Sequence, residues 1–573
     1  MAQPTVTTAS GASWQDIATD RQRHRDATIA QLSPPLQDAA IDLPQNTTGT
    51  PRSILTDEEL TITGTNVEDL ITKLTLGQWS ATVVVKAFMR RAGLAQKLAN
   101  CVTELLPERA LKRAAELDEY LATNKRPIGP LHGIPISVKE HIGMKGLDLN
   151  AGFVSWVGKV AREDALILEC LWDAGAVFYV RTTQPQTLMH LETSSSLYGV
   201  TVNPFNTTLT SGGSSGGEGA LVGLRGSILG IGTDIGGSIR SPAANNGVFG
   251  FKPTALRLPI NGWSATMAGS EQIIPTIGPL STSLEGCKIF TKVILDREPW
   301  LKAPNLVPIP WRDGKIGGDG KIGGDGKKLR VGVIWDDGVV RPHPPILRAL
   351  TEMVEKLKGA PEVELVDWKP WKHDLAWEIT AKLYFADGAA EEKTAIDASG
   401  EPYAHLSKWI LENPHVREHS IHSLWAATQE REDYRITYAE LWNATASESP
   451  DGQPVDVILC PVGPGVAPKL GTSKYWGYTS QWNLLNYPAV VFPVSGNNVS
   501  VKNDGKGIYD YPEEYTPMSD ADKYNHDLWR EHGAEGYKDA PISLQLVGRM
   551  YEDEKLLAAL ETLLDAAGLP KSC

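Results

Sequence analysis

The stretch SGGSSGGEGALVGLRGSILGIGTDIGGSIRSPAANNGVFGFKPT, residues 211–254, is the most glycine-dense part of the chain. It holds two serine clusters flanked by glycine, at 212–217 and 236–238. Glycine beside a serine lets backbone N–H groups turn toward one point and leaves room for a substrate carbonyl. A flexible Gly/Ser loop would be polar and repetitive, whereas apolar residues such as Ile228 and Ile231 lie between these serines. The pattern therefore predicts an oxyanion hole beside a nucleophilic serine.

Two other interpretations of this stretch are weaker. The pattern G-x-S-x-G occurs in overlapping frames centred on Ser214 and Ser215, as in the nucleophile elbow of α/β-hydrolases. That elbow needs a strand directly before it, and the segment 201–212 is a poor strand because Pro204 and several Asn and Thr residues interrupt it. A dinucleotide-binding loop is not expected either, because GIGTDI lacks the third glycine of that fingerprint.

Strands and helices alternate around this stretch. GIPISVKEHI, residues 133–142, is typical of a strand with a functional end. AVFYVRTT, residues 176–183, is typical of a buried strand, and it follows an expected helix at 164–175. An alternating strand and an amphipathic helix close the chain at 540–568. This alternation predicts an α/β domain.

The first hundred residues are instead typical of helices. Residues 13–32 carry a helical apolar face with Ser13 as the N-cap, and a proline pair ends the helix. Residues 67–105 predict two more amphipathic helices, separated by a turn at Gly77.

Composition excludes several classes of protein. The 573 residues are 41% hydrophobic and 22% charged, which is ordinary for a globular chain with a large core. The formal charge of −14 makes nucleic acid an unexpected partner, since an acidic surface repels phosphates. Neither a signal peptide nor a membrane span is expected, so we expect a cytoplasmic protein. The five cysteines are scattered and form no C-x-x-C pair, so no metal site is predicted.

The glycine–serine stretch closely resembles that of the amidase signature family, whose members carry GGSSGG, then GTDIGGSIR about two dozen residues later, and a lysine upstream. This chain supplies all three parts, with Lys139, Ser214 and Ser238 in that order. Further similar segments, among them TVNPFN, GFKPT and NYPAVVFPV, extend over roughly residues 65–565. The sequence is most similar to the fungal acetamidase and general amidase branch, and is similar also to fatty-acid amide hydrolases.

The resemblance implies a Ser-Ser-Lys triad. Ser238 would be the nucleophile, and Ser214, on a cis peptide bond, would relay a proton between Ser238 and Lys139. A lysine base must be neutral, and burial lowers the pKa of lysine. The apolar residues Ile136 and Val138 beside Lys139 favour such burial.

The resemblance also implies substrate-binding residues. Backbone N–H groups of one loop would hold the oxyanion, namely those of Ile235, Gly236, Gly237 and Ser238. Leu188, with the residues up to Leu191, would form part of an apolar wall of the acyl pocket. The region 360–490 holds eight tryptophans, which we expect to fill the core more than to line the pocket.

The expected architecture is one large α/β domain of the amidase signature fold, with a mixed β-sheet core covered by helices on both faces. This catalytic domain would span 66–573 and carry an exposed glycine-rich loop at 313–328, where the hexamer KIGGDG is repeated. Residues 1–65 would form an N-terminal helical arm that packs on the body or contributes to a homodimer. The implied function is hydrolysis of a small-molecule carboxamide to a carboxylic acid and ammonia or an amine, through an acyl-serine and without metal or cofactor.

Three alternatives stay open at this point. A glutamine-dependent amidotransferase subunit would need a partner and an ammonia tunnel. A non-catalytic scaffold would not need the complete triad. A Ser–His mechanism could use His132 or His141, which lie near Lys139 in the sequence. We expect Asp234 and Arg240, which flank the nucleophile, to hold the loop, and Ser215 to be structural or a hydrogen-bond partner.

Overall fold

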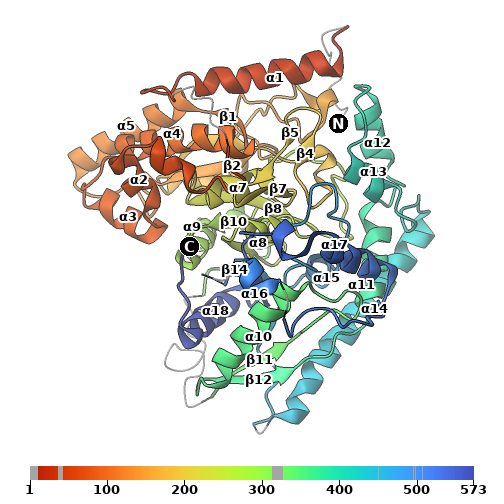
Figure 1. Cartoon of the computed structure of the whole chain (residues 1–573). Coiled ribbons are helices and arrows are strands. Elements are labelled where there is room, and N and C mark those ends of the chain that lie inside the picture. Colours follow the sequence, from red (N-terminus) through yellow and green to blue (C-terminus); the bar gives the residue numbers. More distant parts are fainter. Residues whose placement is uncertain are drawn as a thin grey trace.

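A mixed β-sheet runs through the molecule (Figure 1). Of the predicted triad, Lys139 ends the strand β2 and Ser238 follows the strand β8. The computed structural model describes residues 11–36, 43–312, 327–449, 451–494, 496, 498–505 and 507–573. Within these residues the sheet has eleven strands in the order β1-β3-β2-β8-β10-β9-β14-β15-β13-β11-β12. The strands are β1 (Val102–Leu105), β2 (Pro135–Lys139), β3 (Val177–Thr182), β8 (Leu229–Asp234), β9 (Phe249–Lys252), β10 (Thr276–Ser281), β11 (Leu329–Val333), β12 (Val363–Asp367), β13 (Val457–Pro461), β14 (Ala489–Pro493) and β15 (Ser543–Val547).

Helices surround the sheet in the described residues. They are α1 (Trp14–Ile29), α2 (Asp57–Gly64), α3 (Val67–Thr75), α4 (Ala81–Ala99), α5 (Pro107–Asn124), α6 (Leu166–Asp173), α7 (Gly216–Gly223), α8 (Arg240–Asn245), α9 (Leu284–Leu295), α10 (Pro344–Lys358), α11 (His373–Tyr384), α12 (Ala390–Asp397), α13 (His405–Leu411), α14 (Ile421–Ala444), α15 (Gly477–Leu484), α16 (Val501–Asp504), α17 (Asp520–Gly536) and α18 (Asp553–Ala567). None of these helices has the length and apolar character needed to cross a membrane.

Strand pairing is both parallel and antiparallel. β2 is parallel to β3 and β8, and β11 is parallel to β12 and β13. The strands between these groups pair antiparallel, from β8–β10 through β9, β14 and β15 to β13. The expectation of a mixed sheet is confirmed.

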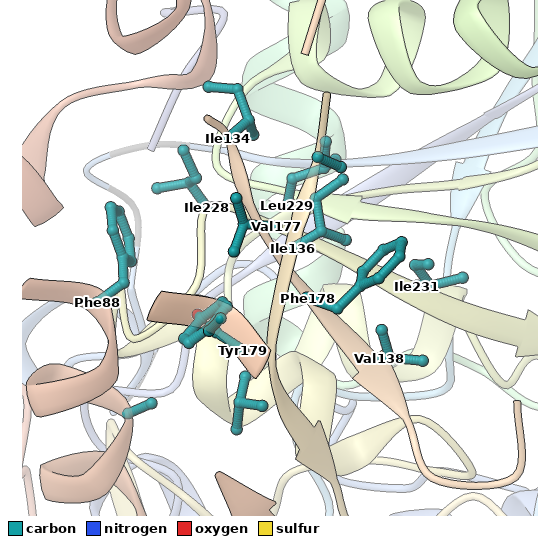
Figure 2. Close-up of a cluster of buried hydrophobic side chains, with 14 of the residues drawn as sticks. Phe88, Ile134, Ile136, Val138, Val177, Phe178, Tyr179, Ile228, Leu229 and Ile231 are labelled. Atoms are coloured by element: carbon teal, nitrogen blue, oxygen red, sulfur yellow. The ribbon is translucent and has the colours of Figure 1, made fainter. Parts of the chain in front are cut away.

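Both faces of the sheet are buried under helices. Successive side chains of a strand point to opposite faces. In β13, Val457 and Leu459 pack in a core with α10 and α18, whereas Ile458 and Cys460 pack in a core with α11 and α14. A third core fills the first half of the chain, and Figure 2 shows part of it, with Phe88 of α4 near Tyr179 of β3.

The elements expected from periodicity are present. The strand expected at 133–142 is β2, and Lys139 is its last residue. The helix and strand expected at 164–183 are α6 and β3, and those at 540–568 are β15 and α18. α3 and α4 flank Gly77, whose φ is +65°.

The expectation for residues 201–212 was wrong. Two short strands, β6 (Val202–Asn203) and β7 (Asn206–Thr210), pair there in a sheet of their own. Pro204 does not break a strand because it lies in the turn between the two, where Asn203 Oδ1 accepts a hydrogen bond from the N–H of Phe205 at 2.9 Å. The central sheet does not include β7, so Ser214 does not follow a strand of that sheet.

The N-terminal segment packs on the body. Ser13 caps α1 as expected, because its Oγ accepts from the N–H of Asp16 while the Asp16 carboxylate accepts from the N–H of Ser13. Leu32 and Ile62 belong to the same core cluster as the strands of the first half. The division at residue 65 stays a prediction, and the glycine-rich loop lies outside the described residues except for its last two positions.

Candidate active site

Lys139, Ser214 and Ser238 come from three different segments. Lys139 ends β2, and Ser238 lies in the turn between β8 and α8. Because β2 and β8 are parallel neighbours, their carboxyl ends meet at one edge of the sheet. Ser214 lies in the turn before α7, and Ser214 and Ser238 both line a cavity of about 540 Å³.

Lys139 is fully buried, with 0% of its surface exposed. Its Nζ lies 2.6 Å from Ser214 Oγ and 3.0 Å from Thr233 Oγ1. Burial lowers the pKa of Lys139 to about 7, against the opposing charges of Asp234 and Glu218. A large fraction of this lysine is therefore neutral near pH 7 and able to accept a proton.

The two serine clusters are fixed to one another. The N–H of Ser215 donates to the carbonyl oxygen of Ser238 at 3.1 Å, and Ser215 Oγ accepts from the N–H of Thr233 at 3.2 Å. The Gly213–Ser214 peptide bond is cis, as the family resemblance implied. A Cβ on Gly213 would lie 2.5 Å from the carbonyl oxygen of His190, so only glycine fits there.

Asp234 holds the loop that carries Ser238. Its carboxylate accepts from the N–H groups of Gly237 at 2.9 Å and Ile239 at 3.1 Å, and it forms a buried ion pair with Arg240 at 2.9 Å. Burial disfavours the charged carboxylate, but the Arg240 guanidinium outweighs it and lowers the pKa of Asp234 to about 2. Asp234 and Arg240 thus have the structural contacts expected of them.

Two side chains remote in sequence orient the peptides of this loop. Tyr384 Oη donates to the carbonyl oxygen of Ile235 at 2.5 Å, and Thr479 Oγ1 donates to that of Gly236 at 2.6 Å. In a trans peptide the following N–H points the opposite way, so the first bond turns the N–H of Gly236 away from Tyr384. The N–H of Gly237 donates to the carboxylate of Asp234. It is therefore not free to join an oxyanion hole, although the sequence led us to expect this role.

The cavity wall is mostly apolar. Leu188, Ile235 and Ser238 line it as expected, whereas Gly236 and Gly237 are not among its lining residues. Met189 also lines it, but His190 and Leu191 do not. Several wall residues were missed because no sequence motif marks them, among them Leu256, Ile260, Trp263, Met267, Ile273, Leu383 and Tyr384.

Four of the eight tryptophans of the region 360–490 are buried in the core, namely Trp368, Trp442, Trp476 and Trp482, whereas Trp425 is exposed. The other three pack partly buried against the same core. None of these eight tryptophans is among the described residues that line the cavity. Trp476 lies behind the wall, with its ring 6.2 Å from that of Tyr384 and 5.6 Å from that of Trp377. No group of three or more His, Cys, Asp or Glu side chains in the described part of the chain is arranged to hold a metal ion.

The two candidate histidines differ in position. His141 lines the cavity, whereas His132 does not, and the Nδ1 of His132 accepts from the N–H of Ile128 at 3.2 Å. Burial lowers the pKa of both imidazoles.

A family model, relatives in sequence and a solved structure all indicate the same family. A family model described as Amidase matches residues 83–557. A putative amidase of Schizosaccharomyces pombe is 43% identical over 96% of this chain and 99% of its own length. An acetamidase of Emericella nidulans is 38% identical over 96% of this chain and 97% of its own. The solved structure of a fatty acid amide hydrolase superposes with a TM-score of 0.88 at 34% identity, covering 97% of this chain and 96% of the other.

These matches extend far beyond the serine clusters and include the whole central sheet. The resemblance inferred from GGSSGG and GTDIGGSIR is confirmed, and so is the fold expected from it. The chain belongs to the amidase signature family and is a hydrolase that acts on amides.

Proposed function

We propose that this enzyme cleaves carboxamides through an acyl-serine intermediate, with Ser238 as nucleophile, Ser214 as proton relay and Lys139 as base. The observation that carries the proposal is the fully buried Lys139, whose Nζ lies 2.6 Å from Ser214 Oγ beside a cavity that Ser238 also lines. An exposed lysine with its ordinary pKa of about 10.4 would be protonated and could not serve as a base near neutrality.

The proposed reaction runs as a relay from Ser238 through Ser214 to Lys139. Neutral Lys139 accepts the proton of Ser214 as Ser214 accepts that of Ser238, and Ser238 Oγ bonds to the amide carbon. The N–H groups of Ile235, Gly236 and Ser238 stabilise the oxyanion. The relay then runs backwards, protonates the leaving nitrogen and allows the C–N bond to break. Water, deprotonated by the same relay, attacks the acyl-serine and releases the acid.

The walls of the cavity support an apolar acyl group. A volume of about 540 Å³ lies within the range of small-molecule sites, about 300–1,000 Å³. Leu188, Ile235 and Trp263 would surround the acyl chain with apolar contacts.

Substitution and labelling of Ser238 test the assignment. We expect Ser238→Ala to abolish hydrolysis of aliphatic and aryl amides with little change in melting temperature, because the acyl-enzyme cannot form. A serine-reactive phosphonate should label Ser238 alone, as mapped by mass spectrometry. Stable labelling of Ser214 or Ser215 instead would contradict the proposal.

The purified chain alone should release ammonia from primary amides, which an amidotransferase subunit lacking its partner would not do.

A further inference from the structure

A chain of hydrogen bonds leads from Lys139 through Thr233 to His141. Thr233 Oγ1 lies 3.0 Å from Lys139 Nζ and 3.1 Å from His141 Nε2. His141 Nδ1 lies 2.9 Å from the carbonyl oxygen of Ser264. Thr233, His141 and the lysine are all buried.

The direction of each hydrogen bond in this chain follows from its ends. The carbonyl oxygen of Ser264 can only accept, so His141 Nδ1 carries a proton. Burial, helped by the charge of Lys139, lowers the pKa of His141 well below its usual value, so the ring is neutral and Nε2 has a free lone pair. The hydroxyl of Thr233 therefore donates to His141 Nε2.

This direction constrains the lysine. A hydroxyl has one proton, and Thr233 donates it to His141, so Thr233 can only accept from Lys139. Neutral lysine has two N–H bonds and one lone pair. One N–H is directed at Thr233, so the lone pair is not taken up by Thr233 and is available to Ser214. A Thr233 hydroxyl without His141 could rotate and donate to that lone pair, in competition with Ser214.

The His141 ring is held firmly. It stacks on Trp263 with ring centroids 5.4 Å apart and planes 30° apart. Its backbone N–H donates to Gln184 Oε1 at 3.2 Å, and its carbonyl oxygen accepts from the N–H of Ser264 at 2.8 Å. The position of Nε2 is thus fixed from both the side chain and the main chain.

We propose that His141 is a positioning residue, which acts through Thr233 to direct the lone pair of Lys139 at Ser214. The inference rests on the proposed function, since it assigns to Lys139 the part of base. It gives His141 a role other than that of the base in a Ser–His mechanism.

Two amide variants provide a matched pair for the test. His141→Gln places an amide oxygen near the position of Nε2, where it can accept from Thr233, whereas His141→Asn reaches only the position of Nδ1. His141→Phe keeps the ring on Trp263 and removes both nitrogen atoms. General-base catalysis contributes about 10²–10⁴-fold, so losing part of its alignment should lower kcat about 10- to 100-fold in His141→Phe and His141→Asn. We expect KM to change little and His141→Gln to recover most of kcat.

Thr233→Val tests the same connection by a nearly isosteric change. Because His141 acts through Thr233, the double variant Thr233→Val/His141→Phe should be no slower than the slower single variant. Should the two losses multiply, or should His141→Gln be as slow as His141→Phe, the proposal is wrong. Melting temperatures identify any variant that fails to fold, and Thr233→Val then decides by itself through its kcat.

The pH profile separates this inference from the proposed function. The charged groups that face Lys139 from neighbouring elements are Asp234 and Glu218, and both remain in every variant. The acidic limb of kcat/KM should therefore persist in His141→Phe, with a lower plateau. If Lys139→Ala stays active or Ser238 escapes the phosphonate, the proposed function fails. If both behave as expected but His141→Phe keeps the kcat of the wild type, only the role of His141 is refuted.

Discussion

Two lysines in this enzyme have the same burial and different surroundings. Lys139 is the last residue of β2, and Lys252 is the last residue of β9. At most 1% of either side chain is exposed, and burial lowers the pKa of each to about 7. By solvation alone, both would qualify as a base at neutral pH.

Their hydrogen-bond partners differ. Lys139 Nζ lies against the hydroxyls of Ser214 and Thr233 at the cavity, whereas Lys252 Nζ donates to the carbonyl oxygen of Pro253 at 3.3 Å. Lys252 is not among the described residues that line the cavity. A lowered pKa therefore identifies a candidate base, and a serine hydroxyl beside a cavity distinguishes the candidate that the proposed mechanism uses.

The largest expected effect is on the rate. Lys139→Met should lower kcat/KM by about 10²–10⁴-fold, because in the proposed mechanism it removes the base and leaves Ser214 without a proton acceptor. Lys252→Met is the matched control, with the same change at an equally buried strand end, and should keep kcat/KM within a few-fold of the wild type. Steady-state kinetics on one amide measures kcat/KM for both variants. Equal losses of kcat/KM in the two variants would contradict the assignment of the base to Lys139 alone.

The second expected effect is on the pH dependence. In the wild type, kcat/KM should rise with pH along a limb near pH 7, where Lys139 loses its proton. Lys252→Met should retain this limb, and the residual activity of Lys139→Met should lack it. A limb that survives in Lys139→Met would assign the titration to another group.

The smallest expected difference is in stability, where the two lysines should behave alike. Each has a folded-state pKa near 7, below its ordinary value, so between about pH 7 and 10 the unfolded chain binds more protons than the folded one. The free energy of unfolding should therefore gain a contribution from each lysine as pH rises through that window. Each pKa unit corresponds to about 1.4 kcal/mol. Both Met variants should show a smaller rise than the wild type in urea unfolding at pH 7 and pH 9, and a steeper rise in either would contradict the lowered pKa.

Much of the fold was predictable from local pattern. β2, α6 and β3 follow from alternating apolar runs and an amphipathic helix, which depend on residues close together in the chain. The strands β6 and β7 were missed because the turn at Pro204 was interpreted as a break in one strand. That error arose because a proline between two strands and a proline inside one look alike without knowledge of the pairing.

The site was predictable where its residues belong to one motif. The two glycine–serine clusters and the lysine upstream indicated Lys139, Ser214 and Ser238. Tyr384 and Thr479, which orient the loop before Ser238, come from α11 and α15 and were not predicted. Their contacts depend on packing between segments more than a hundred residues apart, which no local pattern reports.

The sequence by itself indicated a strand around Lys139, in GIPISVKEHI, whereas the strand that ends at Lys252 came from the structure. The apolar neighbours of Lys139 favoured its burial, and Lys252 is buried beside apolar neighbours in the same way. Only the tertiary structure placed the hydroxyls of Ser214 and Thr233 at Lys139 and left Lys252 with a backbone carbonyl. The physical reason is that burial of a strand end follows from its own apolar neighbours, whereas the partner of a buried amine is supplied by whichever distant segments pack against it.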